Sequence, residues 1–235
     1  MAVGKPYEFD MQDIEYLRHG EQPLLARWFD ILVDYAKSTP EEIVIRITAV
    51  NRGPDPAPLH VLPTLWFRNT WSWNTGNTGN PGNPDDTGAR PSLARHDDAT
   101  IALDEPLYGR RWLHLEPAGS PQLLFTGNDT NTARVFGWSG DHRSDDALTV
   151  DEPTYTKDAF HRHLVDREAG TINPAARGTK AAAWYALTIP AGESRVIRAR
   201  LSDVAPDEGQ ARSGQVRPGN TLFGEAFETM LAARR

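Results

Sequence analysis

Short segments in which apolar and polar residues alternate recur along the chain, and they constrain its fold more than any other feature. The clearest pair is Trp28–Ala36 and Ile43–Val50, which the turn residues of 37–42 separate. Neighbouring side chains of a strand point to opposite faces, so this period of two predicts a β-hairpin. Asn51–Pro54 supplies turn residues that end the second strand.

Further short segments follow at the spacing of an antiparallel β-sandwich. An edge strand is expected at Tyr7–Met11, and a last hairpin joins Trp184–Ile189 to Arg195–Leu201. Between them we expect extended segments at Leu59–Trp73, Thr100–Asp104, Arg111–Glu116, Gln122–Thr126, Arg134–Trp138, Thr154–Arg162 and Gly178–Ile189.

Apolar residues at helical spacing in Leu222–Arg235 predict a C-terminal helix. The predicted fold is therefore mainly β: an antiparallel, supersandwich-like β-sandwich over residues 1–204, with a linker and helix over 205–235. The repetitive stretch 74–90 within the sandwich is low in complexity and is expected to be an inserted exposed loop. It is either a disordered insertion or a lid.

Composition excludes several function classes. The net charge is −7 and the sequence has no basic stripe, which argues against nucleic acids and anionic membranes as partners. We find no apolar run near the ~18 residues of a membrane span and no signal-peptide core, so a cytoplasmic location is expected. The absence of cysteine removes disulfides and thiolate metal sites. Nucleotide-binding and hydrolase motifs are also absent, and no cofactor is expected.

The segment Leu65–Trp73 holds three of the seven tryptophans. As a strand it would place Leu65 and Phe67 on one face and Trp66 and Arg68 on the other, so that aromatic surface lies on both sides. One interpretation is a core strand covered on both faces, and the other is an edge that faces a carbohydrate or a second domain.

His161 and His163 form the best metal candidate. On a strand they would share a face, and with Glu168 they give a pattern that resembles the first metal motif of cupins. Tyr155 stands where that motif has glycine, and Arg195 replaces the histidine of the second motif. The alternative is a surface or hydrogen-bonded histidine pair, and we predict no metal.

Several blocks in the same order resemble bacterial proteins of glycoside hydrolase family 63, the processing α-glucosidase and mannosylglycerate hydrolase family. They are WFDILVDYAKSTPEEIVIRITAVNRGP, LHVLPTLWFRNTWSW, FTGNDTNTARVFG, YTKDAFH, INPAARGTKAAAWY and LTIPAGES. The resemblance implies a non-catalytic N-terminal β-sandwich that packs against an (α/α)6 barrel, where the carboxylates of an inverting hydrolysis reside. The chain resembles the sandwich alone, as a fragment, an excised domain or a stand-alone relative, and is expected to be inactive by itself.

The resemblance also implies a set of site residues. They would face the barrel and form one wall of its sugar pocket, or only hold the interdomain interface: Trp66, Arg68, Asn69, Trp71, Trp73, Lys157, Asp158 and His161. The implied partners are a barrel in the same or a neighbouring chain and an oligosaccharide, and self-association of the isolated domain is expected. The alternative functions are a stand-alone carbohydrate-binding module and a cupin-like metal protein.

Overall fold

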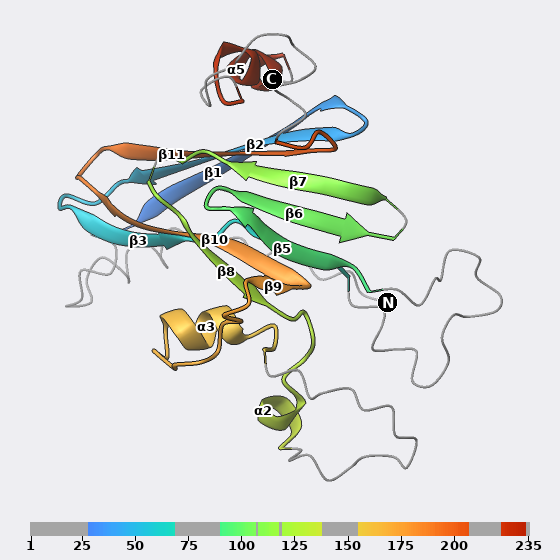
Figure 1. The fold of residues 1–235 in the computed structure, drawn as a ribbon. Helices are drawn as coiled ribbons and strands as arrows, with labels where there is room; N and C mark the ends of the chain where they lie inside the picture. The colour runs from blue at the N-terminus through green and yellow to red at the C-terminus, as the bar shows by residue number, and fades with distance from the viewer. Residues whose placement is uncertain are drawn as a thin grey trace, which may run out of the picture.

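The computed structural model describes residues 28–68, 90–106, 108–117, 119–137, 155–206 and 222–233 (Figure 1). These residues form a mainly β, antiparallel β-sandwich with a C-terminal helix, as the sequence predicted. The strands are β1 (Phe29–Thr39), β2 (Glu42–Asn51), β3 (Ala57–Val61), β4 (Thr64–Trp66), β5 (Ser92–Asp97), β6 (Thr100–Glu105), β7 (Gly109–Leu115), β8 (Gln122–Thr126), β9 (Arg177–Gly178), β10 (Lys180–Ile189) and β11 (Ser194–Ser202), and the helices are α2 (Thr132–Phe136), α3 (Ala159–Leu164) and α5 (Glu225–Ala232).

The larger sheet has seven strands in the order β1-β2-β11-β7-β6-β5-β9. The predicted first hairpin is confirmed, because β1 pairs with β2 from Phe29 opposite Asn51 to Thr39 opposite Glu42. β11 then lies between β2 and β7 and joins β1 and β2 to the rest of the larger sheet. The predicted last hairpin is wrong, because β10 belongs to the smaller sheet and the turn at 190–193 carries the chain from one sheet to the other. This arrangement places segments distant in sequence beside one another.

The smaller sheet is organised around β10. On one side β10 pairs with β3 and β4, and on the other it pairs with β8. The main core fills the space between the two sheets. Its members from the larger sheet include Ile47, Ile101 and Leu113, and those from the smaller sheet include Phe125 and Tyr185. Alternation along each strand explains why these residues point inward.

A helix covers part of the outer face of each sheet, at opposite sides of the sandwich (Figure 1). Phe223, Phe227 and Leu231 of the α5 segment pack on Ala36 and Val44 of the larger sheet. Across the molecule, the α3 region packs on the smaller sheet through Phe160, Leu124 and Ala182. None of the helices in the described part of the chain is both long enough and apolar enough to cross a membrane.

Two of the expected strands are helical instead. Residues 132–136, which overlap the predicted strand Arg134–Trp138, form α2, which Asn131 caps at its start and Gly137 ends with a left-handed φ of 69°. The Asn131 side chain accepts a hydrogen bond from the Arg134 amide, and glycine adopts positive φ without steric cost. Residues 159–164 form α3.

The predicted strand Leu59–Trp73 is also interrupted within its described part, residues 59–68. It separates at Leu62 and Pro63 into β3 and β4, and regular structure ends at Trp66. Proline has no amide to donate to a ladder, which accounts for the break. β5 was not anticipated. The predicted edge strand Tyr7–Met11 and residues 74–89 of the predicted loop lie outside the described residues.

β1 carries an exposed apolar stripe made of Ile31, Val33 and Tyr35, which are 48%, 45% and 67% exposed. Tyr35 and Val33 stand opposite Ile45 and Ile47, which belong to the main core, so the stripe lies on the inner face of the larger sheet. Within the described residues, the smaller sheet leaves this edge of the inner face exposed.

Candidate functional site

Two of the predicted site residues, Trp66 and Lys157, are each linked to Lys180 at one edge of the smaller sheet. Trp66 ends β4 and stands opposite Lys180, the first residue of β10. The ammonium group of Lys180 donates a hydrogen bond to the carbonyl oxygen of Lys157 at 2.6 Å. With the neighbouring Asp158, these residues form what we term the sheet-edge site: Trp66, Lys157, Asp158 and Lys180.

Close backbone packing holds this edge together. The amide of Gly127 donates to the carbonyl of Tyr155 at 3.1 Å, and the amide of Lys157 donates to the carbonyl of Asp129 at 2.9 Å. A Cβ at Gly127 would lie 2.6 Å from the Tyr155 carbonyl oxygen, so only glycine fits there. The buried Thr126 hydroxyl donates to the carbonyl of Thr156 at 2.8 Å, which joins the end of β8 to the segment that carries Lys157.

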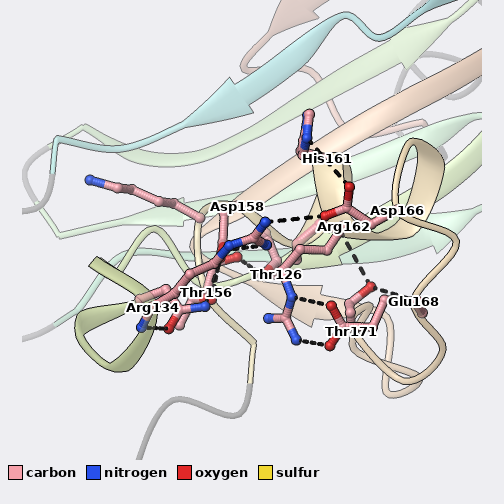
Figure 2. Close-up of polar contacts among 12 residues, drawn as sticks. Thr126, Arg134, Thr156, Asp158, His161, Arg162, Asp166, Glu168 and Thr171 are labelled. Atoms are coloured by element: carbon pink, nitrogen blue, oxygen red, sulfur yellow. Dashed lines mark hydrogen bonds and ion pairs between the residues drawn. The ribbon is translucent and has the colours of Figure 1, made fainter. Parts of the chain in front are cut away.

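The Asp158 carboxylate is held by groups from two segments (Figure 2). The Thr156 hydroxyl donates to one oxygen at 2.5 Å, and the Asn131 amide donates to the other at 3.0 Å. Arg134 of α2 adds a charge at 3.6 Å. Partial burial acts to raise the pKa of Asp158, but the hydrogen bonds from Thr156 and Asn131 outweigh it and place that pKa below its ordinary value. Asp158 is therefore an ionised acceptor at neutral pH.

Two ammonium groups accompany this carboxylate. Lys157 donates to the Thr130 hydroxyl at 3.0 Å, and the Lys180 ammonium lies 5.0 Å from the centre of the Phe160 ring. Burial, followed by repulsion from Lys157, lowers the pKa of Lys180. The site thus offers hydrogen-bond donors and an ionised acceptor side by side.

Trp66 gives the site an aromatic surface. Its side chain is 56% exposed, whereas Leu65 and Phe67 pack against the main core. The alternation predicted for these three residues is confirmed. Asn128 donates to the Phe67 carbonyl at 2.8 Å and so anchors the chain just before the exposed Arg68. An indole beside donors and a carboxylate can stack on the C–H face of a sugar and bind its hydroxyls.

Other predicted site residues are not brought to this edge by the contacts that the structure records. His161 lies on α3 with its Nε2 atom 3.7 Å from a carboxylate oxygen of Asp166 (Figure 2). Asn69, Trp71 and Trp73 lie outside the described residues, so the part of the prediction that rests on them stays a prediction.

The strand geometry assumed for the metal candidate is wrong. His161 and His163 lie on a helix, where residues two apart point to different sides. Glu168 pairs with Arg162, whose Nε donates to it at 2.8 Å. Within the described ranges, no three histidine, aspartate or glutamate side chains are grouped so that they could hold a metal ion. His161 and His163 thus each have contacts of their own, in keeping with the alternative interpretation of a surface or hydrogen-bonded histidine pair.

His163 instead contributes to an aromatic cluster on the outer face of the smaller sheet. Its ring lies edge-on to Trp184 with 6.1 Å between centroids. The indole N–H of Trp184 donates to Nδ1 of His60 at 2.9 Å, which requires that nitrogen to be unprotonated. Sequence reasoning missed this cluster, because the pairing of β3 with β10 is needed to bring His60 and Trp184 together.

Sequence reasoning also missed Lys180 of the sheet-edge site, and it missed Thr130 and Asn131, which bind the side chains of Lys157 and Asp158. Lys180 stands at the start of an apolar strand, and 127–131 reads as an ordinary turn. One local signal was available for Asn131. Asparagine is a common N-cap residue and glycine a common residue at the end of a helix, so Asn131 and Gly137 could have marked the two ends of a short helix.

Comparison with known proteins gives little functional information. No protein-family model matches the chain. An uncharacterized protein of Saccharomyces cerevisiae, YMR196W, is 28% identical over 221 aligned positions, which include 83% of this chain. The chain spans about a fifth, 19%, of the length of that relative. The similarity is therefore to one part of a much longer yeast protein.

Proposed function

We propose that this chain is the non-catalytic sandwich domain of an inverting α-glycosidase of the family 63 type. It would support a helical catalytic barrel and contribute one wall of the sugar site. The family assignment rests on the ordered sequence blocks described above. The long yeast relative supports the idea that such a region belongs to a larger protein.

The observation that carries the domain proposal is the exposed apolar stripe on β1. Ile31, Val33 and Tyr35 point along the inner face of the larger sheet, where apolar side chains gain most from being covered. A second folded body would bury this stripe. Among the described strands β1 is also the edge of its sheet, so its outer backbone edge adds to the interaction surface.

The chemistry of the sheet-edge site supports a role other than acid catalysis. A glycosidase needs one carboxyl group whose pKa is raised so that it can protonate the leaving group. The pKa of Asp158 is lowered instead, as hydrogen bonds stabilise its ionised form. Asp158 is suited to accept hydrogen bonds from sugar hydroxyls or from a partner domain.

Sedimentation and turnover measurements on the purified chain test this proposal. We expect self-association of the isolated chain through the stripe and no hydrolysis of 4-nitrophenyl α-D-glucopyranoside. The double variant Ile31→Ser/Val33→Ser should shift the chain to monomer. Tyr108→Ser, which changes an exposed aromatic residue between β6 and β7, is the matched control and should not. A monomeric wild-type chain, or turnover that Asp158→Asn abolishes, would contradict the proposal.

A stand-alone carbohydrate-binding module is the second candidate function. The exposed Trp66 opposite Lys180, whose ammonium group binds the Lys157 carbonyl, favours it, since an indole near such polar groups suits a sugar ring. Calorimetry with gluco- and manno-oligosaccharides distinguishes the two functions at this site. A module should bind them and lose binding in Trp66→Ala, whereas a supporting domain without its barrel should show no Trp66-dependent binding.

A further inference from the structure

The outer face of the larger sheet holds a hollow of about 410 Å³ over β5, β6 and β7. We term it the outer trough. It is lined by Ser92, Ala94 and His96 of β5, Ala102, Leu103 and Asp104 of β6, Arg110 and Trp112 of β7, and Ala205. Leu93, Leu103 and Leu113 belong to the main core, and the residues next to them in each strand point to the opposite face, so the trough opens away from the core.

The register of the three strands arranges these side chains in two rows. Ala94, Ala102 and Trp112 stand opposite one another in one row, and Ser92, Asp104 and Arg110 form the next. Directly opposite side chains lie about 5 Å apart at Cβ. The two alanine methyl groups therefore make a low floor beside the indole, and a hydroxyl, a carboxylate and a guanidinium border it.

The segment after β11 closes one end of the trough. Ala205 contributes to its lining, and the neighbouring Val204 makes a backbone hydrogen bond to the buried His114. Ser202, which stands opposite Trp112, is also buried. The strand that carries Trp112 is thus packed against a second segment of the chain, so ligand binding there costs little conformational entropy.

The charged pair that borders the trough favours a neutral ligand. Asp104 and Arg110 form a loose pair at 3.9 Å, and both side chains remain more than half exposed. Together they contribute no net charge, so neither an anion nor a cation gains strongly from the pair. Adjacent hydroxyl groups can donate to the carboxylate and accept from the guanidinium at the same time.

We propose that the outer trough binds a neutral pyranose ring, with its C–H face on Trp112 and its hydroxyls on Asp104 and Arg110. The volume falls within the range of small-molecule sites. The ring would lie over Ala94 and Ala102, where any larger side chain would occupy its place. This site belongs to the opposite sheet from the sheet-edge site and goes beyond the function proposed above.

Fluorescence and saturation-transfer NMR titrations of the full chain with methyl α-D-glucopyranoside test the proposal. We expect saturable binding with a dissociation constant on the order of 1 mM. The larger side chain of Ala94→Leu would occupy the space above the floor of the trough and should weaken binding at least tenfold. Asp104→Ala and Trp112→Ala should weaken it as well, while Trp66→Ala, the matched change on the other sheet, should leave it intact.

Titrations with charged sugar analogues are the second part of this test. Methyl α-D-glucuronide and glucosamine should each bind more weakly than the neutral sugar. Absence of saturable binding, affinity unchanged in Ala94→Leu, or tighter binding of either charged analogue would overturn the proposal. Binding that only Trp66→Ala removes would place the sugar at the sheet-edge site and equally overturn it. None of these outcomes bears on the domain proposal, which sedimentation and turnover test separately.

Discussion

The two outer faces of the sandwich carry helices that dock in different ways. α5 sits on the larger sheet through the fully buried Phe227 and a chain of ion pairs. Glu228 of this helix accepts hydrogen bonds from Arg46 at 2.8 Å and from Arg198 at 2.8 Å. Arg198 also pairs with Glu116 at 3.0 Å, so the charges beneath α5 satisfy one another.

α3 sits on the smaller sheet with fewer large apolar contacts. Ala159 and Phe160 are its buried residues, and the neighbouring Asp158 is held by Thr156 and Asn131. Beside it, Trp66 remains more than half exposed. The comparison indicates that the α5 face is built for stability, whereas the α3 face leaves an aromatic surface and charges available for a partner or ligand.

The largest expected effect tests whether the α3 face depends on close backbone contact. A Cβ at Gly178 would lie 2.1 Å from the carbonyl oxygen of Thr126, where the backbone must move. Gly178→Ala should therefore lower the free energy of unfolding by more than about 3 kcal/mol in urea titrations. Gly170→Ala is the control: its φ of 74° is strained for alanine but the space is open, and about 1 kcal/mol is expected. Equal losses in the two variants would show that the close contact does not matter.

Removal of the buried ring at each helix tests the difference in docking directly. Phe227→Ala should cost about 3–5 kcal/mol, because a large cavity opens between α5 and the sheet. Phe160→Ala should cost less, since Phe160 keeps some exposure. If Phe227→Ala instead produces a separate early transition in urea, α5 undocks alone and the α5 face contributes little to the stability of the sheets.

Charge removal gives a smaller pair of effects. Glu228→Gln leaves two half-buried guanidinium groups with a weaker partner and should cost roughly 1 kcal/mol after discounting for its partial exposure. Asp158→Asn should cost no more than that at pH 7.

Asp158 also predicts a pH dependence. Its folded pKa lies below the unfolded value of 3.8, so its contribution is present above pH 3.8 and is lost as pH falls through the folded pKa. Asp158→Asn should flatten the stability profile below pH 4 in urea titrations. A profile that matches the wild type in this range would contradict the hydrogen-bonded carboxylate described here.

The smallest expected effect comes from the buried His114 on the α5 side. Its pKa is lowered chiefly by burial, below the ordinary value of 6.5. The unfolded chain therefore binds the proton first, and stability should decrease as pH falls from 6.5 toward the folded pKa. His114→Gln should remove this slope in thermal denaturation scans, and His161→Gln on α3, at the opposite side of the sandwich, serves as the control. A slope that persists in His114→Gln assigns it to another group.

Much of the sandwich could be predicted from local pattern. Strict alternation identified β1 and β2, and residues 222–231 at helical spacing identified α5. Predictions for short segments were less reliable. Residues 159–164 are too few to distinguish the period of a helix from that of a strand, and no side-chain hydrogen bond at the N-cap of α3 signals where the helix begins. The candidate sites were predicted only in part, because Trp66 and Lys157 came from resemblance, while Lys180 depends on cross-strand pairing.

The sequence by itself determined the mainly β class, the first hairpin and the alternation of Leu65, Trp66 and Phe67, because each follows from the fixed geometry of neighbouring residues. Tertiary structure alone decided which residues share a surface. Ala94, Ala102 and Trp112 form one row because β5, β6 and β7 pair in a particular register. The apolar stripe of β1 is exposed because the smaller sheet does not cover it. Both depend on pairings between segments, which a local pattern does not specify.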